Sequence, residues 1–166
     1  NVAPTASPEA VTPLPIEGSP VSFRANAYDP GADHLTYLWT FSDGVTSNLP
    51  NPTHTFSDDG TYAGSLFVSD GDGGSVTTYF ETVVLNAPPV ITSVHVPQGL
   101  LEGMGGELAA TASDPAGDND VISFEWNFGD GSAPATGARV THAFFGEGRF
   151  DVTVIARDED GGEARR

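Results

Sequence analysis

Carboxylate side chains gather in four short, turn-rich segments of this chain. They lie at residues 29–33, 70–72, 114–120 and 158–160. Calcium takes six to eight oxygen ligands at about 2.3–2.6 Å and tolerates irregular geometry, so carboxylate and amide oxygens from separate loops can bind it. Asp and Asn are also the residues that turns favour, because their side chains hydrogen-bond the local backbone. Each segment by itself fits either interpretation.

Other kinds of site chemistry are excluded or disfavoured by composition. The chain has no Cys and no Lys, which excludes disulfides, thiolate metal sites, thiol nucleophiles and Schiff-base catalysis. A glycosidase pair of carboxylates needs one acid in an apolar pocket, whereas the acids here lie in glycine-rich loops. An EF-hand starting at Asp70 fails because Gly74 and Ser75 stand at its fifth and sixth positions. We therefore expect no catalytic activity.

The charge and length of the chain limit its partners. Six Arg stand against 23 Asp and Glu, giving a formal charge of −17. Such a chain repels polyanions, which excludes nucleic acid and anionic membrane surfaces as partners. No apolar stretch approaches the roughly 18 residues of a membrane span, so we expect no membrane insertion. Because the first residue is not Met, we expect the sequence to be a segment of a longer protein.

The elements that position these acids are β-strands. Apolar residues recur with a period of two over 21–27, 35–41, 76–84, 124–128 and 150–156, separated by clusters of Gly, Pro, Asp, Asn and Ser. This alternation is typical of half-buried strands, and no helical window competes with it. The fold class is therefore all-β.

An internal repeat divides the chain into two copies, which we place at 1–85 and 86–166. Trp39-Thr40-Phe41-Ser42-Asp43-Gly44 matches the segment Trp126–Gly131, and the flanking motifs recur in the same order. His54 and His142 fall at equivalent positions, which indicates a structural role for both. About 85 residues with seven short strands suit an antiparallel two-sheet sandwich with a central Trp on its third strand.

The shared motifs resemble those of the polycystic kidney disease (PKD) domain family. They are Asp-Pro, Trp-x-Phe-x-Asp-Gly, His-x-Phe, Gly-x-Tyr/Phe and Asp-x-Asp-Gly-Gly, and the likeness covers both copies almost end to end. The first copy departs at Ser42, where Gly is usual, so we expect the φ angle of Ser42 not to be positive. The resemblance implies tandem seven-stranded immunoglobulin-like sandwiches of secreted or cell-surface proteins, without catalysis.

The resemblance also implies a cofactor. Several bacterial PKD domains bind calcium through the Asn that opens the domain and the Asp residues of the loop between the second and third strands. In this topology the last hairpin loop lies at the same end, where acids would repel one another without a cation. The predicted ligands are Asn1, Asp29, Asp33, Asp70 and Asp72 in the first copy, and Asn86, Asp114, Asp118, Asp120, Asp158 and Asp160 in the second.

Two functions compete. The first is a calcium-stiffened spacer or adhesion module in an extracellular or cell-surface, prokaryotic protein, whose partners are neighbouring domains of the same polypeptide. The Pro88-Pro89 linker favours this function because prolines restrict the chain. The alternative is an accessory module that binds a polysaccharide or structural protein beside a secreted hydrolase. Phe67 and Tyr79 fall on the outward parity of their strands and are the candidate binding residues.

The last strand differs between the copies. In the first copy, residues 75–85 alternate as a final strand after Gly73-Gly74, whereas only four residues follow Gly161-Gly162 in the second. We therefore expect the second sandwich to lack most of its last strand and to expose an edge along Phe150–Arg157. The sequence leaves two explanations open: a cut end, or a strand donated by a neighbouring chain such as the stretch Asn1–Leu14.

Overall fold

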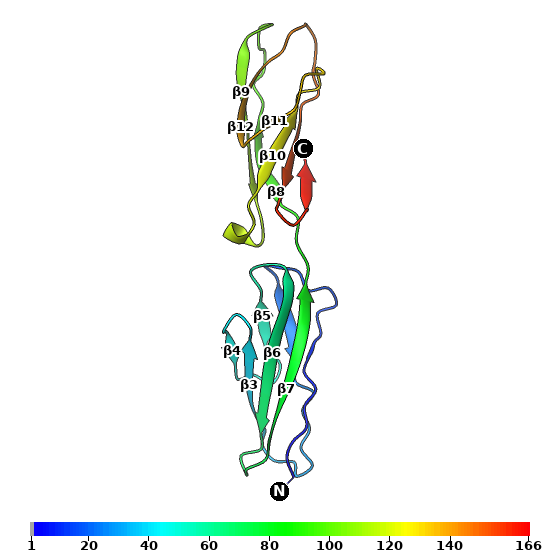
Figure 1. Ribbon diagram of the computed structural model, residues 1–166, viewed down its shortest axis with the longest axis vertical. Helices are drawn as coiled ribbons and strands as arrows, with labels where there is room; N and C mark the ends of the chain where they lie inside the picture. The colour runs from blue at the N-terminus through cyan, green and yellow to red at the C-terminus, as the bar shows by residue number, and fades with distance from the viewer. Residues whose placement is uncertain (1) are drawn as a thin grey trace. The chain divides into compact units, whose positions relative to one another are not determined.

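The computed structural model describes residues 2–166, which divide into two compact units, one up to residue 86 and one from 87 to 166. Each unit is an antiparallel sandwich of two sheets (Figure 1). The described residues form fourteen strands, seven in each unit. The predicted all-β fold with two tandem seven-stranded sandwiches is confirmed.

The first domain contains a three-stranded and a four-stranded sheet. One sheet has the order β1-β2-β5 and the other the order β4-β3-β6-β7. The hairpin of β6 and β7 is paired over its whole length, from Gly60 opposite Val84 to Ser69 opposite Ser75. The strands are β1 (Glu9–Ala10), β2 (Pro20–Arg24), β3 (Thr36–Phe41), β4 (Thr46–Ser47), β5 (Thr53–Thr55), β6 (Gly60–Ser69) and β7 (Ser75–Val84).

The second domain repeats this arrangement with sheets β12-β9-β8 and β11-β10-β13-β14. Its strands are β8 (Val90–His95), β9 (Gly105–Ser113), β10 (Ser123–Asn127), β11 (Ala135–Thr136), β12 (Arg139–Ala143), β13 (Thr153–Arg157) and β14 (Glu163–Arg165). Helical structure within residues 2–166 is limited to one 3-10 turn, Gly117–Asn119. None of the described segments is thus a helix of the length and apolarity needed to cross a membrane.

A tryptophan lies at the centre of each core, on the third strand of its domain as predicted. Trp39 and Trp126 are fully buried, and their indole N–H groups donate to the carbonyl oxygens of Leu49 and Gly137 at 2.9 Å. The first core is rich in aromatic rings, with Phe23 contacting both Trp39 and Phe80. The corresponding position of Phe23 in the second domain is Leu108, so the second core is smaller.

The structure corrects two local expectations. The last long strand of the second domain begins at Thr153 instead of Phe150, because no described strand pairs with residues 148–152. The stretch 1–14 is no spare donor strand in its described part, since β1 pairs with β2 and Thr5 pairs with Tyr28. The short last strand is confirmed: β14 has three residues where β7 has ten.

Candidate functional site

The acidic residues of the first domain lie in two loops at one end of the sandwich. Asp29 and Asp33 lie between β2 and β3, and Asp70 and Asp72 lie in the turn between β6 and β7. Asp29 and Asp70 are buried, with 7% and 5% of their surface exposed, whereas Asp33 is half-buried and Asp72 is exposed. Burying two carboxylates in one loop cluster is costly unless a partner compensates their charge.

Backbone N–H groups hold these carboxylates in place. Oδ1 of Asp70 accepts hydrogen bonds from the N–H groups of Asp72 at 2.8 Å and Gly74 at 2.9 Å, and Oδ1 of Asp29 accepts one from Asp33 at 3.1 Å. Gly74 is required at its position because a Cβ there would collide with the Asp70 carboxylate and lie 2.9 Å from Cα of Ala3. The chain that opens the domain therefore passes directly beside the Asp70 turn.

The carboxylates of this cluster repel one another. Desolvation raises the pKa of Asp33, and the neighbouring carboxylates of Asp29, Asp72 and Asp70 raise it further. The Oδ2 atom of Asp29 is buried and accepts no hydrogen bond from any described residue. Both features are those of a site that favours a cation. Asn1, the predicted fifth ligand, lies outside the described residues.

The second domain repeats the same local geometry. Asp158, which is buried, accepts a hydrogen bond at 2.6 Å from the N–H group of Gly162, and a Cβ on Gly162 would collide with that carboxylate. Asp114 accepts a hydrogen bond at 2.9 Å from the N–H group of Ala116, and its buried Oδ2 has no partner among residues 2–166. The paired loops are therefore a feature of both copies.

The remaining predicted ligands of the second copy differ in exposure. Asp118 lies in the 3-10 turn and is exposed, and Asp160 is exposed in the last hairpin loop. Asp120 follows that turn and is buried. Asn86 is half-buried and is the last residue of the first compact unit.

A separate acidic cluster in the first domain was missed at the sequence level. Glu17, Asp58 and Asp59 each place one carboxylate oxygen within 4.8 Å of the others, and Glu17 is fully buried. The predicted set of Asp29, Asp33, Asp70 and Asp72 does not reach this spacing among the described residues. Ligands on opposite sides of a calcium ion lie about 4.6–5.2 Å apart, so an ion shared by all four residues would require their carboxylates to lie within about 5.2 Å of one another.

The two equivalent histidines are structural. Nε2 of His54 lies 2.7 Å from Oδ2 of Asp43, and His142 makes the same contact with Asp130. Each imidazole also stacks on a phenylalanine, with centroids 4.3 Å apart for His54 and Phe41. Each histidine therefore joins a strand of one sheet to the Asp-Gly turn of the other.

Comparison with known proteins agrees with these features. The PKD domain family matches residues 1–84 and again residues 86–166. The chain belongs to the PKD domain family. The double match covers both sandwiches, so the resemblance seen in the motifs is confirmed.

Parts of several curated proteins are similar in sequence to this chain. The pre-pro-metalloprotease PrtV of Vibrio cholerae is 28% identical over 161 residues, which is 97% of this chain and 17% of that protein. The microbial collagenase of Vibrio alginolyticus is 38% identical over 71 residues, or 42% of this chain and 9% of that protein. The chain therefore spans less than a fifth of the length of these curated relatives.

Among solved structures, the PKD1 domain of Vibrio anguillarum Epp is similar to part of this chain. The sequence identity is 32% with a TM-score of 0.44, over 51% of this chain and 95% of that domain.

The first PKD domain also carries apolar side chains on the outer face of its four-stranded sheet. Leu38 on β3 lies opposite Phe67 on β6, and Tyr79 lies on the adjacent strand β7 opposite Ser65. Leu38 is 41% exposed, Phe67 40% and Tyr79 80%. Phe67 and Tyr79 thus point outward as their parity predicts.

Proposed function

We propose that this tandem of PKD domains is a non-catalytic spacer in an extracellular or cell-surface bacterial protein, and that calcium ions bound at the acidic loops stiffen it. The observation that supports this proposal is the repeated arrangement of two acidic loops. In both domains a buried Asp of the last hairpin loop is fixed by a glycine N–H group. In both, a carboxylate oxygen of the other loop is buried without a hydrogen bond from the described residues.

Calcium would supply the charge that these loops lack. It would be held in the first domain by Asp29, Asp33, Asp70 and Asp72 with Asn1, and in the second by Asp114, Asp118, Asp120, Asp158 and Asp160 with Asn86. Desolvation and the neighbouring carboxylates raise the pKa of Asp33, and the bound ion would offset both by favouring the charged carboxylate. It would also tie the segment that opens each domain to the loops beside it, and so restrict the Pro88-Pro89 linker further.

A calcium titration of the whole chain tests the proposal. At a calcium concentration of about 100 times Kd, binding to the folded state adds about 2.7 kcal/mol to the stability of a domain. For a domain of this size that corresponds to a rise in Tm of about 10–20 °C, which chelation should abolish. Small-angle scattering should then show a narrower distribution of inter-domain angles with calcium. Identical melting and scattering curves with calcium and with chelator would exclude the proposal.

Matched variants distinguish stabilisation by bound calcium from stabilisation by general ionic screening of the net charge of −17. Asp29→Asn should abolish the calcium response of the first domain and Asp114→Asn that of the second, each leaving the other domain responsive. Asp151→Asn removes an exposed acid outside the loops and serves as the control. Magnesium at the same ionic strength should stabilise less, because it demands a stricter octahedral geometry. If calcium and magnesium stabilise the chain equally, and if all three variants respond to calcium as the unchanged chain does, the stabilisation is due to screening only.

The outward apolar face favours a second candidate function, the binding of a polymer substrate for a neighbouring hydrolase. The relatives include a metalloprotease and a collagenase, so collagen is the first polymer to test. Aromatic side chains at a surface bind by stacking and apolar contact, which salt does not weaken.

Retention on insoluble collagen and on insoluble polysaccharides measures this function directly. We expect Phe67→Ala and Tyr79→Ala to reduce retention about tenfold, corresponding to about 1.4 kcal/mol of binding free energy. Phe145→Ala removes an equally exposed ring from the second domain and should leave retention unchanged. If the unchanged chain is not retained on any of these polymers, only the spacer function stands.

A further inference from the structure

Strand β7 is the longest edge strand of any sheet within residues 2–166. It ends the four-stranded sheet of the first domain and has ten residues, whereas the other edge strands have two to six. Natural edge strands are commonly protected from pairing by prolines, bulges or charged side chains. β7 has no proline and no shift of register against β6, and Glu81 is its only charged residue. This edge is therefore poorly protected against pairing with a further strand.

The hydrogen bonds of the β6–β7 hairpin show which backbone groups face this edge. The N–H group of Asp70 donates to the carbonyl oxygen of Gly74 at 3.2 Å, so these two residues form a hydrogen-bonded pair. In an antiparallel ladder such pairs alternate with pairs that are not hydrogen-bonded. The even-numbered residues of β7 therefore bond β6, and the odd-numbered residues from 75 to 83 direct their N–H and C=O groups toward the edge.

The N-terminal segment of the domain covers only one end of this edge. Just beyond β7, the N–H group of Leu85 donates to the carbonyl oxygen of Pro15 at 2.9 Å, and its carbonyl oxygen accepts from the N–H group of Glu17 at 3.1 Å. Residues 5–11 of the same segment bond residues 22–28, on and just after β2 in the other sheet. No residue in the described part of the chain bonds the edge-facing groups of residues 75–83. Five alternate residues therefore offer free donors and acceptors.

The side chains of these five residues lie on the outer face of the sheet. Tyr79 is 80% and Val83 56% exposed, and Tyr79 extends the apolar row of Leu38 and Phe67 to the edge. Glu81 lies between Tyr79 and Val83 on this face and is also exposed. An added antiparallel strand would place one side chain opposite each of them, with Cβ atoms about 4.5–5.5 Å apart. The complementary strand therefore has an aliphatic residue opposite Tyr79 and a basic residue opposite Glu81.

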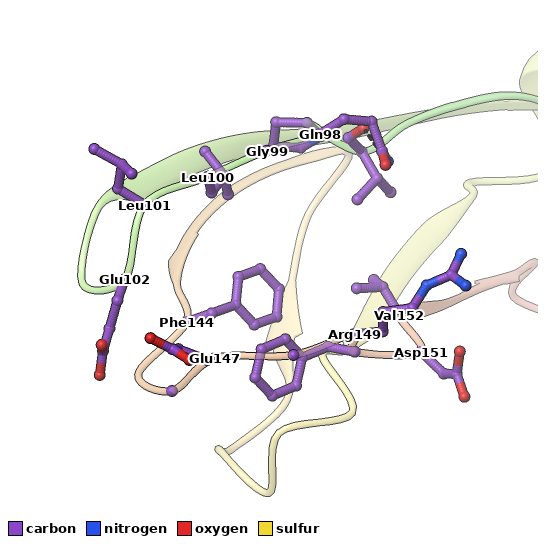
Figure 2. A pocket seen from close by; sticks show the side chains of 15 residues that line it. Gln98, Gly99, Leu100, Leu101, Glu102, Phe144, Glu147, Arg149, Asp151 and Val152 are labelled. Carbon is purple, nitrogen blue, oxygen red and sulfur yellow. Dashed lines mark hydrogen bonds between the residues drawn. The ribbon is translucent and has the colours of Figure 1, made fainter.

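The second domain has no equivalent edge within residues 87–166. Strand β14, which corresponds to β7, has three residues. The residues from 144 to 152 form no strand, and together with residues 96–102 they line a cleft of about 1040 Å³ (Figure 2). A long, regularly paired edge strand is therefore a feature of the first domain among the described residues.

We propose that the edge of β7 binds an extended segment of another polypeptide, which pairs antiparallel with residues 75–83 and carries a basic residue opposite Glu81. This inference rests on the second candidate function, the binding of a polymer by the outward apolar face, and names a polypeptide as the polymer. A polysaccharide has no alternating N–H and C=O groups to pair with the edge. A second copy of this chain fits less well, because two chains of charge −17 repel each other.

The test uses a synthetic peptide of nine residues and the full chain. The odd-numbered residues of the peptide are valine, lysine, isoleucine, threonine and threonine, placed to lie opposite Val83, Glu81, Tyr79, Thr77 and Ser75. The four residues between them are serine or threonine. One modified peptide is N-methylated at its third and fifth residues, whose N–H groups would face β7. The matched control is N-methylated at the fourth and sixth, whose N–H groups would face away. Fluorescence anisotropy of the labelled peptide measures Kd.

We expect N-methylation at the third and fifth residues to weaken binding at least tenfold, because it leaves carbonyl oxygens of β7 without donors. N-methylation at the fourth and sixth residues should weaken binding less than about threefold. In NMR exchange measurements on the chain, the bound peptide should slow the edge-facing amides of residues 77, 79 and 81 about tenfold or more. Equal effects of the two modified peptides, or no slowing of these amides, overturn the proposal.

Variants of the chain test the register. Glu81→Lys should weaken binding about fivefold, and a peptide with glutamate in place of its lysine should recover it. Thr77→Pro removes an edge-facing N–H group without removing a bond to β6, so it should weaken binding while the chain stays folded. Asp151→Asn should leave binding unchanged. Weakening by Asp151→Asn as large as that by Glu81→Lys would show general attraction of a cation and overturn the register.

Three further outcomes separate this proposal from its alternatives. If the peptide does not bind, but Phe67→Ala and Tyr79→Ala still reduce retention on collagen or a polysaccharide, the proposed edge site is wrong and the second candidate function stands. If neither the peptide nor any polymer is bound, both are wrong. If the chain alone dimerises in sedimentation experiments and Thr77→Pro abolishes the dimer, the edge binds a second copy, and its assignment to another polypeptide is overturned.

Discussion

Gly129 and Gly131 flank Asp130 in the second domain, and replacing each by alanine should have different consequences. Both have positive φ angles, +73° and +83°. A Cβ on Gly131 would meet nothing within 4 Å, whereas a Cβ on Gly129 would lie 2.5 Å from the carbonyl oxygen of Asp151. Backbone atoms cannot move aside as a flexible side chain can. The two substitutions therefore share a conformational cost but differ in a steric one.

The expected magnitudes follow from these two costs. An L residue in the left-handed region costs about 1–2 kcal/mol, part of which is offset because alanine has less freedom than glycine in the unfolded chain. We expect Gly131→Ala to destabilise by about 1 kcal/mol. Displacing a packed neighbour costs about 1–3 kcal/mol more, so Gly129→Ala should destabilise by about 2–4 kcal/mol.

The first domain provides the control. Ser42 is the equivalent of Gly129 and is not among the described residues with positive φ, as predicted from its side chain. Ser42→Ala should therefore change stability by less than about 0.5 kcal/mol. Differential scanning calorimetry of the whole chain should show the transition of the second domain lowered by about 4–8 °C for Gly131→Ala and about 10–20 °C for Gly129→Ala. Equal shifts for both glycine variants would show that the contact with Asp151 does not matter.

Two further predictions concern pH and the cores. Hydrogen bonds from Ser132 and His142 lower the pKa of Asp130 below its ordinary 3.8. The contribution of the ionised Asp130 to the stability of the folded state is therefore complete above about pH 4 and is lost at lower pH as Asp130 protonates in the folded state. In acid, the Tm of the second domain should therefore fall more steeply in the unchanged chain than in Asp130→Asn. Trp126→Ala should lower the free energy of unfolding of the second domain by about 3–5 kcal/mol and abolish the calorimetric transition of that domain alone. Loss of both transitions would contradict the conclusion that the two domains have independent cores.

Much of the fold could be predicted because its determinants are local and occur twice. The alternation around Trp39 and Trp126 indicates strands with an inward aromatic row, and the repeat fixes the domain number. The start of β13 at Thr153 was predicted wrongly, because the alternation continues through Phe150 although none of the strands in the described part of the chain pairs with the backbone there. Local pattern therefore identifies a segment that can form a strand, while pairing decides whether it does.

The candidate site was less predictable. The acids of each loop pair were grouped by topology, but the burial of Asp29 and its unpartnered oxygen depend on how the loops fold over it. The cluster of Glu17 with Asp58 and Asp59 joins residues about 40 positions apart that carry no shared motif. Its counterparts in the second copy are Glu102, Gly146 and Glu147, so the repeat keeps two of the three acids but replaces Asp58.

The full-length pairing of β6 with β7 has a mechanical consequence. The described chain begins at one end of the first sandwich, and β7 leaves it at the opposite end (Figure 1). A pulling force on the chain therefore acts along β7, and the hydrogen bonds of an antiparallel ladder lie perpendicular to that direction. The ten residue pairs between β6 and β7 therefore resist such a force together, in shear. In a hairpin pulled apart from one end, the pairs would break one after another.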